Sequence, residues 1–261
     1  VNDYLAGRDD YRKQPMYPLT AVNVDPGDYI DGPLENFTAG ALRLAPDKKT
    51  YATISNAALD KPFTAELATR SRHGQDPQAR PFTFKGDDLK NPEIYTSNFL
   101  IEVYFKAEGD GLIIGKKDSA GYMLQLKEGM VMFSVAGEGA SANLVSKSRV
   151  AAGDWHHVIA VADREAKTLI LYIDGKRDTT GPGLGPVSLA NDADLYVGGT
   201  PDGEYLNGAI EFLRIAQGTL ADAYTTIEEL YAWQFDGPAQ HDMRGAKPQG
   251  QARDAGAIES Y

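Results

Sequence analysis

Two consecutive apolar runs in the middle of the chain constrain its fold more than any other feature. The first, at residues 155–162, reads Trp-His-His-Val-Ile-Ala-Val-Ala, and the second, at residues 168–173, reads Thr-Leu-Ile-Leu-Tyr-Ile. The polar turn Asp-Arg-Glu-Ala-Lys separates them, and an Asp-Gly pair ends the second run. Because apolar residues alternate in the second run and turn residues bound it, the pattern predicts a β-hairpin within an antiparallel sheet.

This hairpin resembles the midsection of the laminin-G-like, concanavalin-A-like jelly rolls, where a W-H-H-V-A strand precedes an L-x-L-Y-I-D-G strand. The resemblance extends over residues 82–236. It implies an all-β fold, a two-sheet antiparallel jelly-roll sandwich. Lectins, carbohydrate-binding modules, adhesive modules and some glycan-cleaving enzymes share this fold, so the resemblance alone does not choose among these functions.

Further strands are predicted on both sides of the hairpin, at the spacing of a β-sandwich and with turn pairs such as Glu-Gly and Asp-Gly between them. They cover two short pieces within residues 39–54, and residues 99–106, 111–116, 122–126, 131–135, 195–197 and 209–216. One short helix is predicted at residues 225–233. There a Thr N-cap precedes acidic residues, and Ile227, Leu230 and Tyr231 have helical spacing.

The sequence divides into three parts. Residues 1–36 are rich in turn residues and are interpreted as an extended arm or the end of an upstream domain, residues 37–236 as the jelly roll with its core at 82–236, and residues 237–261 as a polar tail. Through Gly245–Pro248 and the Asp-Ala-Gly-Ala-Ile-Glu phrase that follows, the tail resembles the closing segment of secreted right-handed parallel β-helix proteins. That resemblance implies an upstream β-helix domain in a larger bacterial protein, secreted or on the cell surface.

Charge and composition exclude several partners. The chain has 26 Lys and Arg against 37 Asp and Glu, a formal net charge of −11, which repels nucleic acid and anionic membrane surfaces. The same balance disfavours a highly sulfated ligand unless a local Lys/Arg patch overrides the average. The chain has no cysteine, which excludes thiolate metal sites and Cys nucleophiles. No stretch reaches the roughly 20 apolar residues of a membrane span.

No catalytic residue is predicted. Retaining glucanases of this sandwich class carry E-x-D-x-x-E on one strand, which places two carboxylates on one face, and the chain lacks this triplet. Glu102 and Glu211 are isolated on their strands and are expected to face solvent. Trp155 is expected to point into the core. His156 and His157 are expected on opposite faces, which argues against joint metal chelation and leaves room for one buried, hydrogen-bonded histidine.

The sequence therefore favours a non-catalytic carbohydrate-binding or domain-docking module that binds a polysaccharide or oligosaccharide. Sugar binding would use an aromatic side chain flanked by polar hydrogen-bonding groups in a loop at the sheet edge. Tyr205 is the best candidate, with Asp202 and Glu204 beside it. Two alternatives stay open: the carboxy-terminal piece of a parallel-β-helix polysaccharide lyase or hydrolase, and a purely structural interaction domain.

A structural calcium ion is a further expectation. Jelly rolls of this kind often bind one where the first and last core strands meet, and Asp side chains and turn carbonyls supply the hard oxygen ligands that Ca²⁺ prefers. The positions that resemble that site are Asp87, in the Gly-Asp-Asp turn, and Asp236, in the Gln-Phe-Asp segment.

Overall fold

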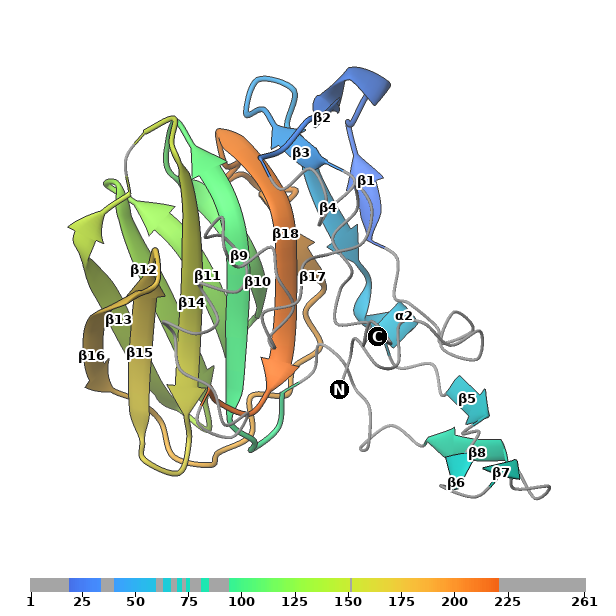
Figure 1. Ribbon diagram of the computed structural model, residues 1–261. Helices are drawn as coiled ribbons and strands as arrows, with labels where there is room; N and C mark the ends of the chain where they lie inside the picture. Colours follow the sequence, from blue (N-terminus) through green and yellow to red (C-terminus); the bar gives the residue numbers. More distant parts are fainter. Residues whose placement is uncertain are drawn as a thin grey trace, which may run out of the picture.

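A computed structural model shows the predicted all-β sandwich (Figure 1). It describes residues 19–33, 40–59, 63–66, 70–71, 74–75, 81–84, 94–150 and 152–220. The helix predicted at 225–233, the polar tail at 237–261 and most of the arm at 1–36 lie outside the described residues. None of the described helices is long and apolar enough to cross a bilayer.

Two seven-stranded antiparallel sheets face each other. The first has the order β1 (Thr20–Val22), β4 (Tyr51–Ile54), β17 (Leu195–Val197), β10 (Gly111–Lys117), β11 (Gly121–Lys127), β12 (Met130–Gly137), β13 (Ala140–Arg149). The second has the order β16 (Lys176–Pro182), β15 (Thr168–Ile173), β14 (Trp155–Asp163), β9 (Phe99–Ala107), β18 (Gly208–Gln217), β3 (Ala41–Leu44), β2 (Tyr29–Ile30).

Short elements complete the described chain. A 3-10 turn, η2 (Pro26–Asp28), precedes β2, and a single helical turn, α2 (Asn56–Leu59), follows β4. Two separate two-stranded sheets lie between β4 and β9 in the sequence: β5 (Phe63–Glu66) pairs with β8 (Pro81–Phe84), and β6 (Arg70–Ser71) pairs with β7 (Gly74–Gln75).

The predicted hairpin is formed by β14 and β15. Val158 pairs with Ile173 and Asp163 pairs with Thr168, so the register covers all of β15 and β14 from Val158 onward. The turn that follows β15 has positive φ at both Asp174 (48°) and Gly175 (75°). This backbone suits the right-handed twist of a two-residue hairpin, because Asp tolerates and Gly favours the left-handed region.

Several short strands and two long ones, β13 and β16, were absent from the sequence prediction. The strands β13 and β16 each form one edge of a seven-stranded sheet, and their sequences, Ala-Ser-Ala-Asn-Leu-Val-Ser-Lys-Ser-Arg and Lys-Arg-Asp-Thr-Thr-Gly-Pro, are largely polar. Only a few side chains of each strand face the interior, among them Leu144, Ser146 and Thr179, which are buried. Edge strands need fewer apolar residues than central ones, so hydrophobic periodicity gives a weak signal for them.

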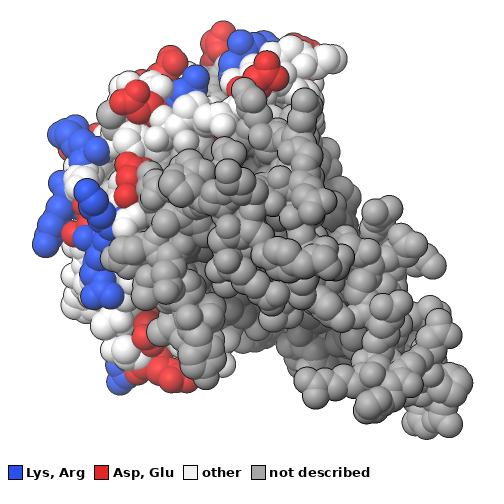
Figure 2. Space-filling view, viewed as in Figure 1, with Lys and Arg blue, Asp and Glu red and all other residues white. Residues whose placement is uncertain are grey.

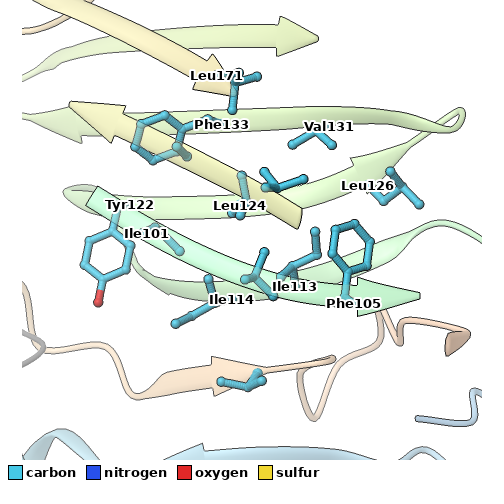
Figure 3. Packing of buried hydrophobic residues seen from close by; sticks show 14 of the residues in the cluster. Ile101, Phe105, Ile113, Ile114, Tyr122, Leu124, Leu126, Val131, Phe133 and Leu171 are labelled. Carbon is cyan, nitrogen blue, oxygen red and sulfur yellow. The ribbon is translucent and has the colours of Figure 1, made fainter. Parts of the chain in front are cut away.

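The main core fills the layer between the sheets. Figure 3 shows side chains from both sheets meeting there, among them Phe105, Leu124 and Phe133. Phe99 of the second sheet contacts Tyr122 and Phe133 of the first, with ring centroids 5.5 and 6.0 Å apart. These large side chains are 0–1% exposed, and burying each stabilises the fold by about 1.5–3 kcal/mol.

Strand β14 is buried on both of its faces. Val158, Ala160 and Ala162 point into the main core, whereas Ile159 and Val161 belong to a second apolar cluster on the outer face of the same sheet. This explains the continuous apolar run of the sequence, since a strand covered on both sides does not alternate. The outer cluster also contains Leu100, Tyr172 and Leu220.

The core placement expected for Trp155 is wrong. Trp155 pairs with Lys106 on β9. Val158 points into the main core, and side chains alternate along a strand, so His156 points inward and Trp155 lies on the outer face of β14. It is only partly buried, and its ring stacks on Tyr104 at 5.3 Å while Lys106 Nζ lies 5.6 Å from the ring centroid.

A buried carboxylate holds the amino-terminal strands in place. Asp28, at the end of η2, is fully buried, and its Oδ1 accepts hydrogen bonds from Arg43 Nη2 at 2.8 Å and Arg43 Nε at 3.2 Å. Its Oδ2 accepts from Lys48 Nζ at 2.8 Å and from the backbone N–H of Asp25 at 3.0 Å. The bonds from Lys48, Asp25 and Arg43 hold the pKa of Asp28 well below its usual range.

Phe105→Ala should lower the free energy of unfolding by about 3–5 kcal/mol, because it leaves a cavity in the main core. Trp155→Ala should cost clearly less, since much of its ring is not enclosed by the core. Chemical denaturation of both variants measures the difference. Equal losses would place Trp155 in the core after all.

Asp28→Asn should reduce stability most at neutral pH. The folded-state pKa of Asp28 lies below its unfolded value of about 3.9, so its contribution is fully present above that pH and is lost as the pH falls towards the folded-state pKa. The difference in unfolding free energy between wild type and variant should therefore shrink below about pH 4. A difference that stays constant from neutral to acid pH would show that the charge of Asp28 does not contribute.

Candidate functional site

The loop after β17 positions the tyrosine that the sequence analysis selected. Thr200 and Gly203 close it with two backbone hydrogen bonds, Thr200 N–H to Gly203 O at 2.8 Å and Gly203 N–H to Thr200 O at 3.1 Å. The chain then turns back, and the Tyr205 ring lies against Gly199, where a Cβ would come within 2.6 Å of Tyr205 Cδ1. Gly199 has a φ of 154°, which residues other than glycine rarely adopt. Glycine therefore fits this position both by its backbone conformation and by the lack of room for a Cβ.

Three tyrosines meet beside this loop, and we call them the tyrosine cluster: Tyr51, Tyr196 and Tyr205. Ring centroids of Tyr51 and Tyr205 are 6.3 Å apart, and those of Tyr51 and Tyr196 are 6.1 Å apart. Tyr51 lies on β4 and Tyr196 on β17, both on the outer face of the first sheet because their neighbours Ala52 and Val197 point into the core. All three side chains are partly exposed.

The segment before β17 is held by a buried lysine. Lys116 Nζ is enclosed and donates hydrogen bonds to the backbone oxygens of Asn191, at 2.8 Å, and Ala193, at 2.9 Å. Asp194 follows directly, and its Oδ1 accepts the backbone N–H of Asn56 at 2.9 Å. These contacts fix the chain that leads into Tyr196, so the tyrosine cluster rests on a rigid support.

Carboxylates surround the tyrosine cluster. Tyr196 Oη donates a 3.5 Å hydrogen bond to Asp194 Oδ2. Partial burial raises the pKa of Tyr196, and the negative charges of Asp194 and Asp202 and the neighbouring Tyr51 raise it further. The phenol therefore stays protonated near neutral pH and keeps its hydrogen-bonding capacity. Tyr205 Oη donates to Pro201 O at 3.3 Å.

The structure brings together two of the three residues predicted as a sugar site. Tyr205 belongs to the tyrosine cluster, and the Asp202 carboxylate is near enough to act on Tyr196. Glu204 is exposed and shapes the loop through its backbone, with φ at 57° and its carbonyl oxygen accepting the Leu112 N–H at 2.8 Å. Sugar binding by these residues stays a prediction. Tyr51 and Tyr196 were not selected from the sequence.

The two residues predicted as calcium ligands, Asp87 and Asp236, lie outside the described residues. Among the residues that the structure does describe, no three His, Asp or Glu side chains come close enough together to hold a metal ion. Calcium binding at Asp87 and Asp236 therefore stays a prediction.

A second polar group lies on the outer face of the second sheet. His157 Nε2 donates a 2.8 Å hydrogen bond to Glu102 Oε1, and Arg214 Nε forms an ion pair with Glu102 Oε2. The Glu102 and His157 side chains are 0% and 1% exposed. His156 lies on the opposite face and hydrogen-bonds Asp174 through Nδ1 at 2.7 Å. The opposite orientation of the two histidines and the burial of one are confirmed.

The solvent-facing placement expected for Glu102 and Glu211 is wrong. Register explains Glu102, since Arg214 lies directly opposite on β18 and His157 lies near it on β14. Glu211 is 8% exposed and sits at a bulge of β18, where its side chain lies against Gly32. Both oxygens of Glu102 are held by basic side chains that join β9, β14 and β18, an arrangement suited to holding strands together.

Two packed antiparallel sheets with an aromatic and acidic cluster on one outer face define a jelly-roll module with an exposed polar–aromatic site. The chain belongs to the concanavalin A-like lectin/glucanases superfamily, because the laminin-G-type model of that superfamily matches residues 46–223.

Several known proteins are similar to it. The mouse basement membrane-specific heparan sulfate proteoglycan core protein is 35% identical over 80 residues, which are 30% of this chain and 2% of that protein. Domains LG4-5 of the mouse laminin α1 chain align at 17% identity and a TM-score of 0.42, over 47% of this chain and 37% of that one. The sialyllactose-bound CBM40 of the Ruminococcus gnavus IT-sialidase aligns at 17% identity and a TM-score of 0.44, over 54% of this chain and 84% of that one.

Proposed function

We propose that the chain is a non-catalytic carbohydrate-binding module and that the tyrosine cluster binds an oligosaccharide. The observation that supports this most is the convergence of three partly exposed tyrosines from β4, β17 and the following loop on one outer face. Aromatic rings stack on the apolar C–H faces of sugars, and nearby carboxylates accept hydrogen bonds from sugar hydroxyls.

The surrounding polar groups fit the same role. Asp194 is already occupied by Asn56 N–H and Tyr196 Oη, so it orients a tyrosine. Asp202 and Glu204 are exposed beside the cluster and are free to accept hydrogen bonds from a ligand. Glu102 does not contribute to the tyrosine cluster, because its carboxylate lies on the other sheet and is paired with His157 and Arg214.

Tyr51→Ala and Tyr205→Ala should each weaken binding of a neutral oligosaccharide by about 1–2 kcal/mol, the scale lost when a stacking aromatic is truncated. A glycan array followed by isothermal titration with the best neutral ligand measures this. Tyr29→Ala is the matched control, because Tyr29 is 64% exposed on β2 of the other sheet. This variant should bind the oligosaccharide as tightly as the wild type does.

Thermal unfolding of each variant separates loss of binding from loss of fold. Unchanged affinity in both tyrosine variants, with the wild type binding glycan, would remove the tyrosine cluster as the site. Absence of any glycan binding by the folded wild type would favour a structural interaction domain. Release of products from a polysaccharide by this chain alone would favour the lyase or hydrolase alternative.

We also propose that the module acts outside a bacterial cell, beside a β-helix domain in a polysaccharide-active protein. The support is the resemblance of residues 245–248 and 254–259 to the closing segment of secreted β-helix proteins. The coding sequence around this chain decides the point, because a β-helix domain has a recognisable repeat.

Calcium should raise the melting temperature if Asp87 and Asp236 bind it, because a ligand that binds only the folded state stabilises it by mass action. Asp87→Asn should weaken that response. Differential scanning calorimetry in excess calcium and in excess chelator measures both effects. Identical melting of the wild type in the two conditions would exclude a stabilising calcium site.

A further inference from the structure

Strands β13 and β16 lie against each other where the two sheets meet at one side of the sandwich (Figure 1). Asp178 of β16 accepts the backbone N–H groups of Lys147, at 2.6 Å, and Ser148, at 2.9 Å. Further along, Gly181 approaches the side chain of Leu144. The two strands therefore run antiparallel, which places the start of β16 beside the end of β13.

This arrangement gathers basic side chains that are scattered in the sequence. Lys147 and Arg149 end β13, Lys176 and Arg177 begin β16, and all four are exposed. We call these four residues the basic edge. Figure 2 shows Lys and Arg side chains gathered along the side where β13 and β16 lie in Figure 1, in a protein whose net charge is −11.

The charges of the basic edge are not neutralised by nearby acids. Among the ion pairs of the described residues, none includes any of the four. Arg149 Nη1 donates to the backbone oxygen of Glu128 at 2.5 Å, and Arg177 Nη2 donates to Tyr172 Oη at 3.3 Å. Both guanidinium groups are therefore held by neutral oxygens.

Two acids close to the basic edge, Asp178 and Asp110, are engaged with backbone. The Asp178 carboxylate accepts two N–H groups of β13, and the Asp110 carboxylate accepts the N–H groups of Glu128 and Gly129. Lysines on edge strands often serve to prevent strand-to-strand aggregation. Here the Asp178 carboxylate already occupies two backbone N–H groups of β13 and so protects part of this edge from pairing with another strand. Protection against aggregation therefore does not by itself account for four cations.

We propose that the basic edge binds a linear acidic polysaccharide, one that bears carboxylates or sulfates at regular intervals. Lys147 and Arg149 end β13, and Lys176 and Arg177 begin β16, so the four cations are spread along the edge where these two strands meet. A row of separated cations suits a chain of repeated anions better than one small anion, which would need donors that converge on a point. This site is distinct from the tyrosine cluster. The three tyrosines come from β4, β17 and the loop after β17, and carboxylates lie near them.

Titration of the wild type with polygalacturonate and with heparin at low salt, repeated at higher salt, tests the proposal. Binding should weaken steeply as salt rises, since exposed charges are screened. The Lys147→Gln/Lys176→Gln double variant should bind roughly 10- to 30-fold more weakly, the scale of losing two cations that face a polyanion. A Lys117→Gln/Lys167→Gln variant, which removes two exposed lysines elsewhere, is the matched control and should bind as wild type.

Two further measurements separate this proposal from others. Tyr205→Ala should leave polygalacturonate binding unchanged, and the Lys147→Gln/Lys176→Gln variant should leave neutral oligosaccharide binding unchanged, so either site can fail without the other. Equal binding of the polyanions by the basic-edge and control variants would overturn the proposal. Retention on vesicles with anionic lipid, without binding to either polysaccharide, would overturn it in favour of a membrane surface.

Discussion

The apolar layer between the two sheets is the constraint on which the rest of the structure depends. β9 lies at its centre, where Phe99 contacts rings of β11 and β12 and where Ile101, Val103 and Phe105 are fully buried. This layer also decides which side chains lie on the outer faces of the sheets. Successive side chains along a strand point to opposite faces, so each inward residue turns its neighbours outward. Tyr51 and Tyr196 face outward because Ala52 and Val197 are committed to the interior.

Much of the fold could be predicted from the sequence, because the central strands are marked by apolar runs and turn pairs. The β14–β15 hairpin and its Asp174–Gly175 turn are confirmed. The polar edge strands β13 and β16 were missed because their few buried residues produce little periodicity. The prediction that Trp155 faces the core was wrong for a related reason. Because β14 is apolar on both faces, its sequence pattern does not show which side chains point inward.

The candidate sites were harder to predict, since each depends on pairings between distant parts of the chain. Tyr205 and Asp202 could be selected from their loop, but Tyr51 joins them only through the β4–β17 pairing. Glu102 was assigned to solvent because the sequence does not show that β18 places Arg214 opposite it. The four cations of the basic edge become neighbours only when β13 and β16 meet at the side of the sandwich.

The position of β9 has a consequence for how the protein is made. Its two partners are β14, about fifty residues later, and β18, about one hundred residues later. At a synthesis rate of roughly 5–20 residues per second, β9 leaves the ribosome roughly 5–25 seconds before β18. During that time a strand that is buried in the folded protein has an unpaired edge, and contacts between such distant segments also form slowly. The nascent chain is therefore exposed to mispairing at a strand that later lies at the centre of its sheet.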